Sequence, residues 1–396
     1  SIWIKSNINI FLQNDLKDAI FHPDLFGNRP PLIYILNKLF NPYFSDFEKY
    51  RLLVFLMSLL GPIIFYKFLL IKFYSVDKKI LFLIASIIYL SPYYRTSGFW
   101  ALNENYAIVS MLLSFLFLEK FLKFEKKILT NLLFVLFFSS LTIYFDQKFL
   151  IVPIVCFFSI IRKEINIKYK FITLVIYFIL SIPYVYLIYR WNGIVPPATQ
   201  LANPNTVTSI GDIKNTYFAH VGYSATLVSF YLFPLTLLTG SYVEITKNLK
   251  RIFLDKRSLS LLFIFIIYII YGFFYFNFEK ITVTDYWIGF GVVQKLTVIV
   301  TDEIFQRKII TYLFFSLSFL LIVYYYFLNK YDFYLISYFL LISIFLWPLM
   351  QEYFDPIVFI ISIALFRSLR LLNKSSTLII MIYQMIFLLI ANAYYN

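Results

Sequence analysis

Apolar residues fill most of this chain in runs of roughly 15 to 22 residues, each bounded by charged residues or by Pro and Gly. Runs of this length match a helix that crosses a membrane and satisfies its own backbone hydrogen bonds in lipid. A transmembrane β-barrel needs short alternating segments instead. The pattern therefore predicts an all-α, polytopic integral membrane protein. We predict about twelve spans, near residues 51–72, 80–94, 104–119, 128–145, 149–161, 170–189, 221–240, 259–276, 309–328, 332–348, 355–368 and 376–393.

The composition agrees with this pattern. Hydrophobic residues make up 61% of the 396 positions and charged residues only 14%, and the mean hydropathy is +0.78. We expect one transmembrane domain over residues 1–396, in which residues 1–50 form the first external loop. The chain starts at Ser1, without an initiator Met or an apolar run before this loop. We therefore expect a fragment that lacks its first span.

The net charge of +14 changes the picture only through its distribution. A nucleic-acid-binding protein would gather Lys and Arg on one patch, whereas here they occupy alternate loops between spans. Cytoplasmic loops collect Lys and Arg, so the basic loops are predicted to face the cytoplasm. The basic loops carry Lys72, Lys78 and Lys79; Lys120, Lys123, Lys126 and Lys127; Arg162, Lys163, Lys168 and Lys170; and Lys247, Lys250, Arg251, Lys256 and Arg257.

The other series of loops is predicted to face the periplasm or a lumen. Two of these external loops are long, one after Tyr189 and one between Asn277 and Lys308, and such loops can shape a cavity at the membrane surface. We predict a site on this side because both histidines and many of the carboxylates lie in these external loops. These external residues are His22, Asp24, Glu104, Asp146, His220, Asp285, Asp302 and Glu303.

Two external segments combine a carboxylate with an arginine. Asp24 and Arg29 lie in HPDLFGNRPPL, where the Pro pair sets a rigid entry to the next helix. Arg95 and Glu104 lie in SPYYRTSGFWALNEN, in which Tyr93 suits the aromatic belt at the interface. Each of these residues also has a simpler explanation. The segment with Asp24 and Arg29 is equally a structured loop whose charges meet water. Glu104 suits the start of a helix by its charge alone, and Arg95 suits contact with a lipid phosphate.

Two more segments carry polar side chains at predicted membrane boundaries. Asp146, Gln147 and Lys148 fall within one turn, which is costly in lipid unless they face water or one another. A plain surface pair of Asp146 and Lys148 explains them equally well. The segment YRWNGIVPPATQ, residues 189–200, places Arg190 and Asn192 beside Gly and a Pro pair in a loop of fixed shape.

These segments resemble the GT-C class of polytopic glycosyltransferases, and most closely the dolichyl-phosphate-glucose α-1,2-glucosyltransferase family. That family has an Asp-Pro element before a Pro-Pro pair, an Asn-Gly-Gly-Ile-Val-Val segment and an Asp-Arg-Gln element. The similar residues here are Asp24, Pro30, Pro31, Leu32 and Tyr34; Asn192, Gly193, Ile194 and Val195; and Asp146 and Gln147. The family also carries an acidic pair where this chain has Ile4 and Lys5, so either that motif lies upstream of Ser1 or the loop is shorter in this chain.

The resemblance implies transfer of a sugar from a polyprenyl-phosphate carrier to a lipid-linked glycan or protein acceptor on the outer face. Such a reaction needs a carboxylate to take the proton of the acceptor hydroxyl, and cations or a divalent metal to stabilise the released phosphate. We expect Asp24, Glu104 and Asp146 to be the catalytic or acceptor-positioning groups. The candidate substrate-binding residues are Arg29, Arg95, Gln147, Lys148, Arg190 and Asn192.

No cofactor is identified from the sequence, and the two histidines and one cysteine offer no metal-ligand spacing. We expect the plasma (inner) membrane of a bacterium rather than the endoplasmic reticulum. A transporter or flippase for lipid-linked saccharides is the main alternative, although a transporter should place polar residues near the bilayer midplane. A polymerase or ligase that uses diphosphate-linked oligosaccharide donors is a further alternative.

Overall fold

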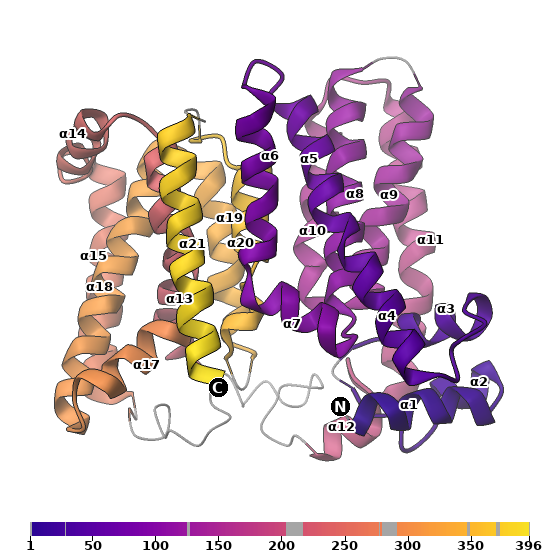
Figure 1. The fold of residues 1–396 in the computed structure, drawn as a ribbon. Coiled ribbons are helices and arrows are strands. Elements are labelled where there is room, and N and C mark those ends of the chain that lie inside the picture. Colours follow the sequence, from indigo (N-terminus) through magenta and orange to yellow (C-terminus); the bar gives the residue numbers. More distant parts are fainter. Residues whose placement is uncertain are drawn as a thin grey trace. The chain divides into compact units, whose positions relative to one another are not determined.

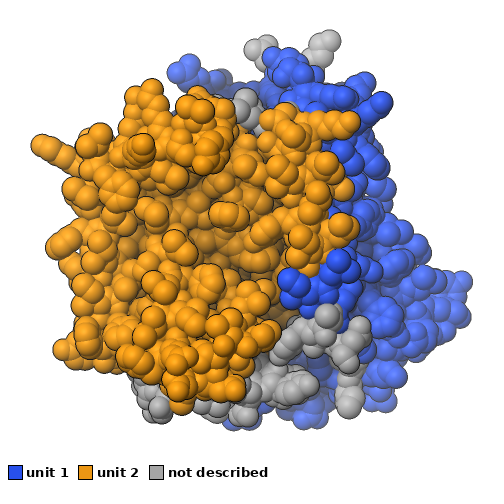
Figure 2. All heavy atoms as spheres, turned by 60° about the vertical axis from the view of Figure 1, so that its left-hand side comes forward, with its two compact units in different colours: residues 1–204, 208–211, 388–396 blue, residues 205–207, 212–387 orange. Residues whose placement is uncertain are grey.

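The computed structural model describes residues 2–27, 29–124, 127–202, 217–276, 278, 291–346, 349–369 and 373–395. Every regular element within these ranges is a helix, and they contain no strand, which confirms the all-α class (Figure 1). Chain contacts divide the protein into two compact units (Figure 2). Unit 1 comprises Ser1–Pro204, Thr208–Gly211 and Leu388–Asn396, and unit 2 comprises Asn205–Val207 and Asp212–Phe387.

The elements follow one another in the order shown by the colours of Figure 1. Unit 1 contains α1 (Ile2–Gln13), α2 (Leu16–Ile20), α3 (Leu32–Phe40), α4 (Phe47–Ser58), α5 (Leu60–Lys72), α6 (Lys78–Ser86), η1 (Ile87–Leu90), α7 (Pro92–Trp100), α8 (Glu104–Lys123), α9 (Ile128–Phe145), η2 (Gln147–Leu150), α10 (Ile151–Arg162), α11 (Ile167–Trp191) and α12 (Pro197–Ala202). Unit 2 contains α13 (His220–Leu235), η4 (Thr236–Leu238), α14 (Tyr242–Ile252), α15 (Lys256–Tyr275), α17 (Gly291–Val300), α18 (Ile304–Leu328), α19 (Lys330–Ser343), η5 (Gln351–Tyr353), α20 (Ile357–Leu365) and most of α21 (Lys374–Tyr395).

Eight helices in the described ranges are long and apolar enough to cross a membrane. Each coincides with one of the twelve predicted spans. They are Phe47–Lys72, Glu104–Lys123, Ile128–Phe145, Ile167–Trp191, His220–Leu238, Lys256–Tyr275, Ile304–Leu328 and Lys374–Asn392.

The other four predicted spans contain shorter helices: α6, α10, α19 and α20. The helix α20 has 9 residues and rises about 13 Å, less than half of the ~30 Å hydrocarbon layer. Its residues from Ile357 to Ala364 are all buried. Their apolar character therefore fits burial within the protein, which the sequence pattern does not distinguish from burial in lipid.

The segment predicted as the first external loop folds into helices rather than an extended loop. Ile4, Ile8 and Phe11 recur at helical spacing and are buried on one face of α1. Phe11 stacks on Tyr34 of α3, with ring centroids 5.5 Å apart. Ile33 and Tyr50 belong to the same cluster. This small core fixes the segment that leads into Arg29.

The basic loops of unit 1 meet at one end of its helices. Lys123, in the last turn of α8, donates to the carbonyl oxygens of Ile71 (2.7 Å) and Lys72 (3.1 Å) at the end of α5. Lys163, after α10, donates to the carbonyl of Phe121. Since α8 begins at Glu104 and ends near Lys123, Glu104 lies at the end of α8 opposite these lysines. This arrangement agrees with the charge asymmetry predicted between the two ends.

The helix α11 is bridged by a side chain at its internal proline, Pro183. The Tyr144 hydroxyl, from α9, donates to the carbonyl of Leu180 and accepts from the amide of Tyr184 (3.2 Å). These two backbone groups lie one helical turn apart across Pro183. Insertion of a hydroxyl at such a position is a recognised cause of helix bending.

Part of the predicted external surface lies outside the described residues. The second half of the loop after Tyr189 falls in residues 203–216, and the first part of the loop between Asn277 and Lys308 falls in residues 277 and 279–290, including Asp285.

Candidate functional site

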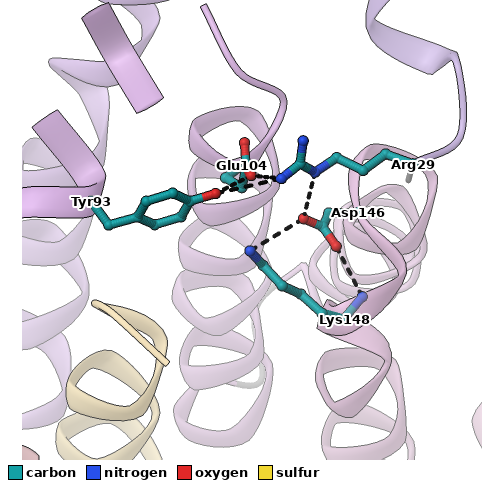
Figure 3. A network of polar contacts seen from close by, with 5 residues as sticks. All are labelled: Arg29, Tyr93, Glu104, Asp146 and Lys148. Atoms are coloured by element: carbon teal, nitrogen blue, oxygen red, sulfur yellow. Dashed lines mark hydrogen bonds and ion pairs between the residues drawn. The ribbon is translucent and has the colours of Figure 1, made fainter. Parts of the chain in front are cut away.

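Arg29 joins two carboxylates that are far apart in sequence (Figure 3). It lies just before the Pro pair, and Pro31 is the N-cap of α3. Its Nε donates to Oδ2 of Asp146 at 3.0 Å, and its Nη2 forms an ion pair with Oε1 of Glu104. The side chain is 16% exposed. The planar guanidinium is suited to holding two carboxylates in fixed positions.

Glu104 is the first residue of α8 and its side chain is fully buried. Besides Arg29, its Oε1 accepts a hydrogen bond from the Tyr93 hydroxyl. Tyr93 is positioned because the Ser91 side chain caps α7 by accepting from the Tyr94 amide at 2.9 Å, with Pro92 as the first helical residue. The second oxygen, Oε2, is buried and makes no hydrogen bond within the described ranges.

Asp146 lies in extended backbone directly after α9 and is buried. Its Oδ1 accepts from the Lys148 amide at 3.0 Å, and its Oδ2 lies 3.3 Å from the Lys148 ammonium. Burial alone would raise the pKa of Asp146, but Lys148, Arg29 and these hydrogen bonds together outweigh burial and lower the pKa below its usual value. Asp146 is therefore ionised at neutral pH.

The four charged groups form a neutral cluster at one end of the α8–α9 hairpin. Glu104 and Asp146 supply the negative charges, and Arg29 and Lys148 supply the positive ones. The Lys148 ammonium also lies over the Tyr93 ring, 5.2 Å from its centroid. Mutual compensation of this kind makes buried charges tolerable, whereas removal of one partner leaves the others uncompensated. We call these four residues and Tyr93 the Arg29 cluster.

Arg29 also lines a small pocket on its other side. The space open to the centre of a water molecule is about 10 Å³, enough for one water. The pocket thus links the cluster to the first segment and to the Pro pair of residues 189–200. Its lining residues are Trp3, Asn7, Leu25, Phe26, Gly27, Arg29, Pro31, Tyr34, Asn103 and Pro196.

Asp24 lies apart from the cluster. Its carboxylate is 83% exposed, and its Oδ2 is 3.9 Å from Nδ1 of His22. The His22 ring nitrogen accepts a hydrogen bond from the Asp24 amide at 3.2 Å. Asp24 directly precedes Leu25, which lines the pocket. The predicted acids therefore divide into one exposed group and two buried ones.

The remaining predicted site residues are not part of the cluster. Arg95 is exposed on α7, and Arg190 is exposed with its guanidinium 5.0 Å from the Phe21 ring centroid. Asn192 is exposed and ends α11 in the left-handed conformation, with φ of 52°. Gln147 is half-buried at the start of η2, beside Asp146 in sequence.

The segment of residues 189–200 has the fixed shape that its Gly and Pro residues predict. Trp191 is buried and donates to the carbonyl of Ile20 at 3.3 Å. The Gln200 amide donates to the carbonyls of Trp191 (2.9 Å) and Val195 (2.8 Å). Thr199 Oγ1 accepts from the Gly27 amide at 2.8 Å, which attaches α12 to the segment before Arg29.

Two residues of the site were not selected from the sequence as site residues. The sequence around Tyr93 indicates only the interface belt, whereas its hydroxyl bonds to Glu104, and nothing in the sequence marks Thr199. The spacing of Tyr93 and Glu104 on either side of a helix break was the available clue. No group of three or more His, Cys, Asp or Glu side chains in the described ranges is arranged to hold a metal ion.

Comparison of the chain with protein-family models, curated proteins and solved structures finds no match.

Proposed function

We propose that this protein is a multi-pass membrane glycosyltransferase that moves a sugar from a polyprenyl-phosphate carrier to an acceptor, and that the Arg29 cluster organises its site. The observation that carries the proposal is the pair of buried carboxylates, Glu104 and Asp146, held by Arg29 and Lys148. Charged groups buried at the end of apolar helices are costly and mark functional sites by default. A protein in which apolar residues replace a buried ion pair is often equally stable, so stability alone does not explain the buried charges here.

The different exposures of the charged side chains favour a different role for each of them. Glu104 and Asp146 are buried and hold the two cations in place, and Arg29, whose side chain is 16% exposed, contacts the phosphate of the carrier. Asp24, which is exposed, takes the proton of the acceptor hydroxyl as the new bond forms. The eight long apolar helices provide the surface along which a polyprenyl chain lies.

The test is transfer of a radiolabelled sugar from a polyprenyl-phosphate donor by the protein in vesicles. We expect Asp24→Asn, Glu104→Gln and Asp146→Asn each to lower the rate by about 100-fold or more, as loss of a general base or of a positioned cation does. Glu104→Gln keeps the size of the side chain while removing the charge that holds Arg29.

Matched controls come from two acids of unit 1 that lie outside the Arg29 cluster. Glu119 of α8 forms an i,i+4 pair with Lys123 at 3.1 Å, and Asp77 caps α6 through the Lys79 amide. Glu119→Gln and Asp77→Asn should retain full activity. Full activity in all three site variants would refute the assignment, and transfer from a soluble nucleotide sugar would refute the donor class.

A further inference from the structure

The amphipathic helix α14 lies between two helices of membrane-crossing length. His220–Leu238 ends just before it, and Lys256–Tyr275 begins just after it. Its start is fixed by a capping box, in which Ser241 and Glu244 each bond the other's backbone amide (3.0 and 3.3 Å). If the two flanking helices cross a bilayer, α14 is confined to within a few residues of its surface.

One side of α14 packs against the other helices of unit 2. Ile252 is fully buried, and Ile245 and Leu249 are half-buried on the same face. The Tyr324 hydroxyl of α18 hydrogen-bonds to the Thr239 hydroxyl at 2.6 Å and to the Asn248 side chain. Figure 1 shows α14 at the end of the unit where α15 begins. The helix is therefore held in place rather than free to detach.

The remaining surface of α14 combines cations with exposed apolar side chains. Lys247, Lys250 and Arg251 are all exposed. Tyr242 at one end is 80% exposed, and Leu254, just beyond the other end, is 82% exposed. Water satisfies the three cations but not these apolar groups. A membrane interface accommodates both, since phosphate groups face the cations and the acyl boundary accepts the apolar side chains.

We propose that α14 is an interfacial helix that binds the headgroups of anionic phospholipids through Lys247, Lys250 and Arg251. This inference rests on the membrane placement in the proposed function but not on the sugar-transfer chemistry. Charge complementarity selects the partner, because the three cations outnumber Glu244, the one acid of the helix, whose carboxylate is engaged in the capping box.

The cationic surface continues past the end of α14. The Asp255 amide donates to the carbonyl of Arg251 at 3.0 Å, and Asp255 borders an open hollow of about 420 Å³. Arg257 and Lys330 also line this hollow. Since Asp255 is the one acid among the lining residues, the hollow adds net positive charge next to the end of α14.

The test uses the full chain with Cys156→Ala, which removes its one cysteine, and Val243→Cys labelled with an environment-sensitive fluorophore. The protein is reconstituted in vesicles of phosphatidylcholine and of an equal mixture of phosphatidylcholine and phosphatidylglycerol. We expect a blue shift of emission in the anionic vesicles that weakens at high salt. Replacing Lys247, Lys250 and Arg251 with Gln should remove most of the blue shift, because each cation removed weakens headgroup binding roughly fivefold.

The matched control replaces three exposed lysines of unit 1, Lys78, Lys79 and Lys168, with Gln and should keep the blue shift.

Equal emission in the two kinds of vesicle, or a full shift in the α14 variant, would overturn the proposal. A shift lost on dilution with excess lipid would assign the surface to a second copy and overturn it too. Release of the protein by alkaline carbonate would show that the membrane placement itself is wrong, and sugar transfer, measured separately, reports on the Arg29 cluster alone.

Discussion

At the residue scale, the guanidinium of Arg29 is the cation that Glu104 and Asp146 share, and Lys148 compensates Asp146 as well. Arg29→Met removes the shared partner of Glu104 and Asp146, and we expect a loss of about 3–5 kcal/mol in the free energy of unfolding, the usual cost of breaking a buried pair. Because Glu104→Gln removes one of the stranded charges, the double variant should lose less than the sum of the two single variants. Denaturation by sodium dodecyl sulfate in mixed micelles measures all three.

The control for this cycle is an exposed ion pair of the same unit. Lys49 and Asp46 lie 3.2 Å apart, and both side chains are largely accessible to water. Lys49→Met should change stability little, because solvent screens such pairs. Additive losses for Arg29→Met and Glu104→Gln would contradict the coupling of these two residues.

The lowered pKa of Asp146 predicts how stability depends on pH. A carboxyl whose pKa is lower in the folded state stabilises that state above its unfolded pKa, near 3.8, and loses this contribution as the pH falls through the lower folded value. Thermal unfolding of the unaltered protein should therefore shift downward below about pH 4. Asp146→Asn should be less stable at neutral pH and show a shallower decline in acid. Parallel curves for the two proteins would rule out this role of Asp146.

The sequence identifies most members of the cluster but not their pairing. The sequence leaves open whether Asp146 and Lys148 face water or each other, and in the structure the carboxylate and the ammonium lie 3.3 Å apart. The contacts of Arg29 with Glu104 and Asp146 join three separate segments of the chain, and no local spacing specifies such long-range pairs. For Asp24 the sequence leaves open a loop whose charges meet water, but it does not indicate that Glu104 and Asp146 are buried.

At the element scale, Thr199 connects α12 to the segment that carries Arg29. Its hydroxyl accepts from the Gly27 amide (2.8 Å) and donates to the Gly27 carbonyl (3.2 Å). Thr199→Val keeps the side-chain shape and leaves both backbone groups without this partner, so we expect a loss of about 1–3 kcal/mol. Hydrogen exchange should show faster exchange at Gly27. Thr96→Val, which removes an exposed hydroxyl bonded within α7, is the control and should leave Gly27 protected.

Helix lengths show where apolar periodicity is informative. The eight long helices coincide with predicted spans because their apolar runs are long as well as continuous. The four short helices differ because an apolar run of nine to fourteen residues is equally compatible with a protein interior. In α1, by contrast, the helical spacing of Ile4, Ile8 and Phe11 is visible in the sequence, but polar residues between them favour a loop.

At the scale of the whole molecule, the two ends of the unit 1 helices differ in charge and chemistry. The lysines that bond to the ends of α5 and α8 lie at one end, and the Arg29 cluster lies at the other. The cysteine-free variant Cys156→Ala allows a direct test of sidedness. Lys78→Cys and Asn192→Cys, both at exposed positions, should react with an impermeant maleimide from opposite sides of the membrane. Asn192→Cys should react in intact cells, and reaction of both from one side would contradict the orientation.

The Tyr144 hydroxyl at Pro183 gives α11 a property that its own sequence does not encode. Because both hydrogen bonds come from Tyr144 of α9, the backbone of α11 around Pro183 is held by a neighbouring helix. The half that follows Pro183 ends at Trp191, directly before Asn192. Loss of the Tyr144 hydroxyl would therefore remove a partner of the Leu180 carbonyl and the Tyr184 amide in the helix that leads to residues 189–200.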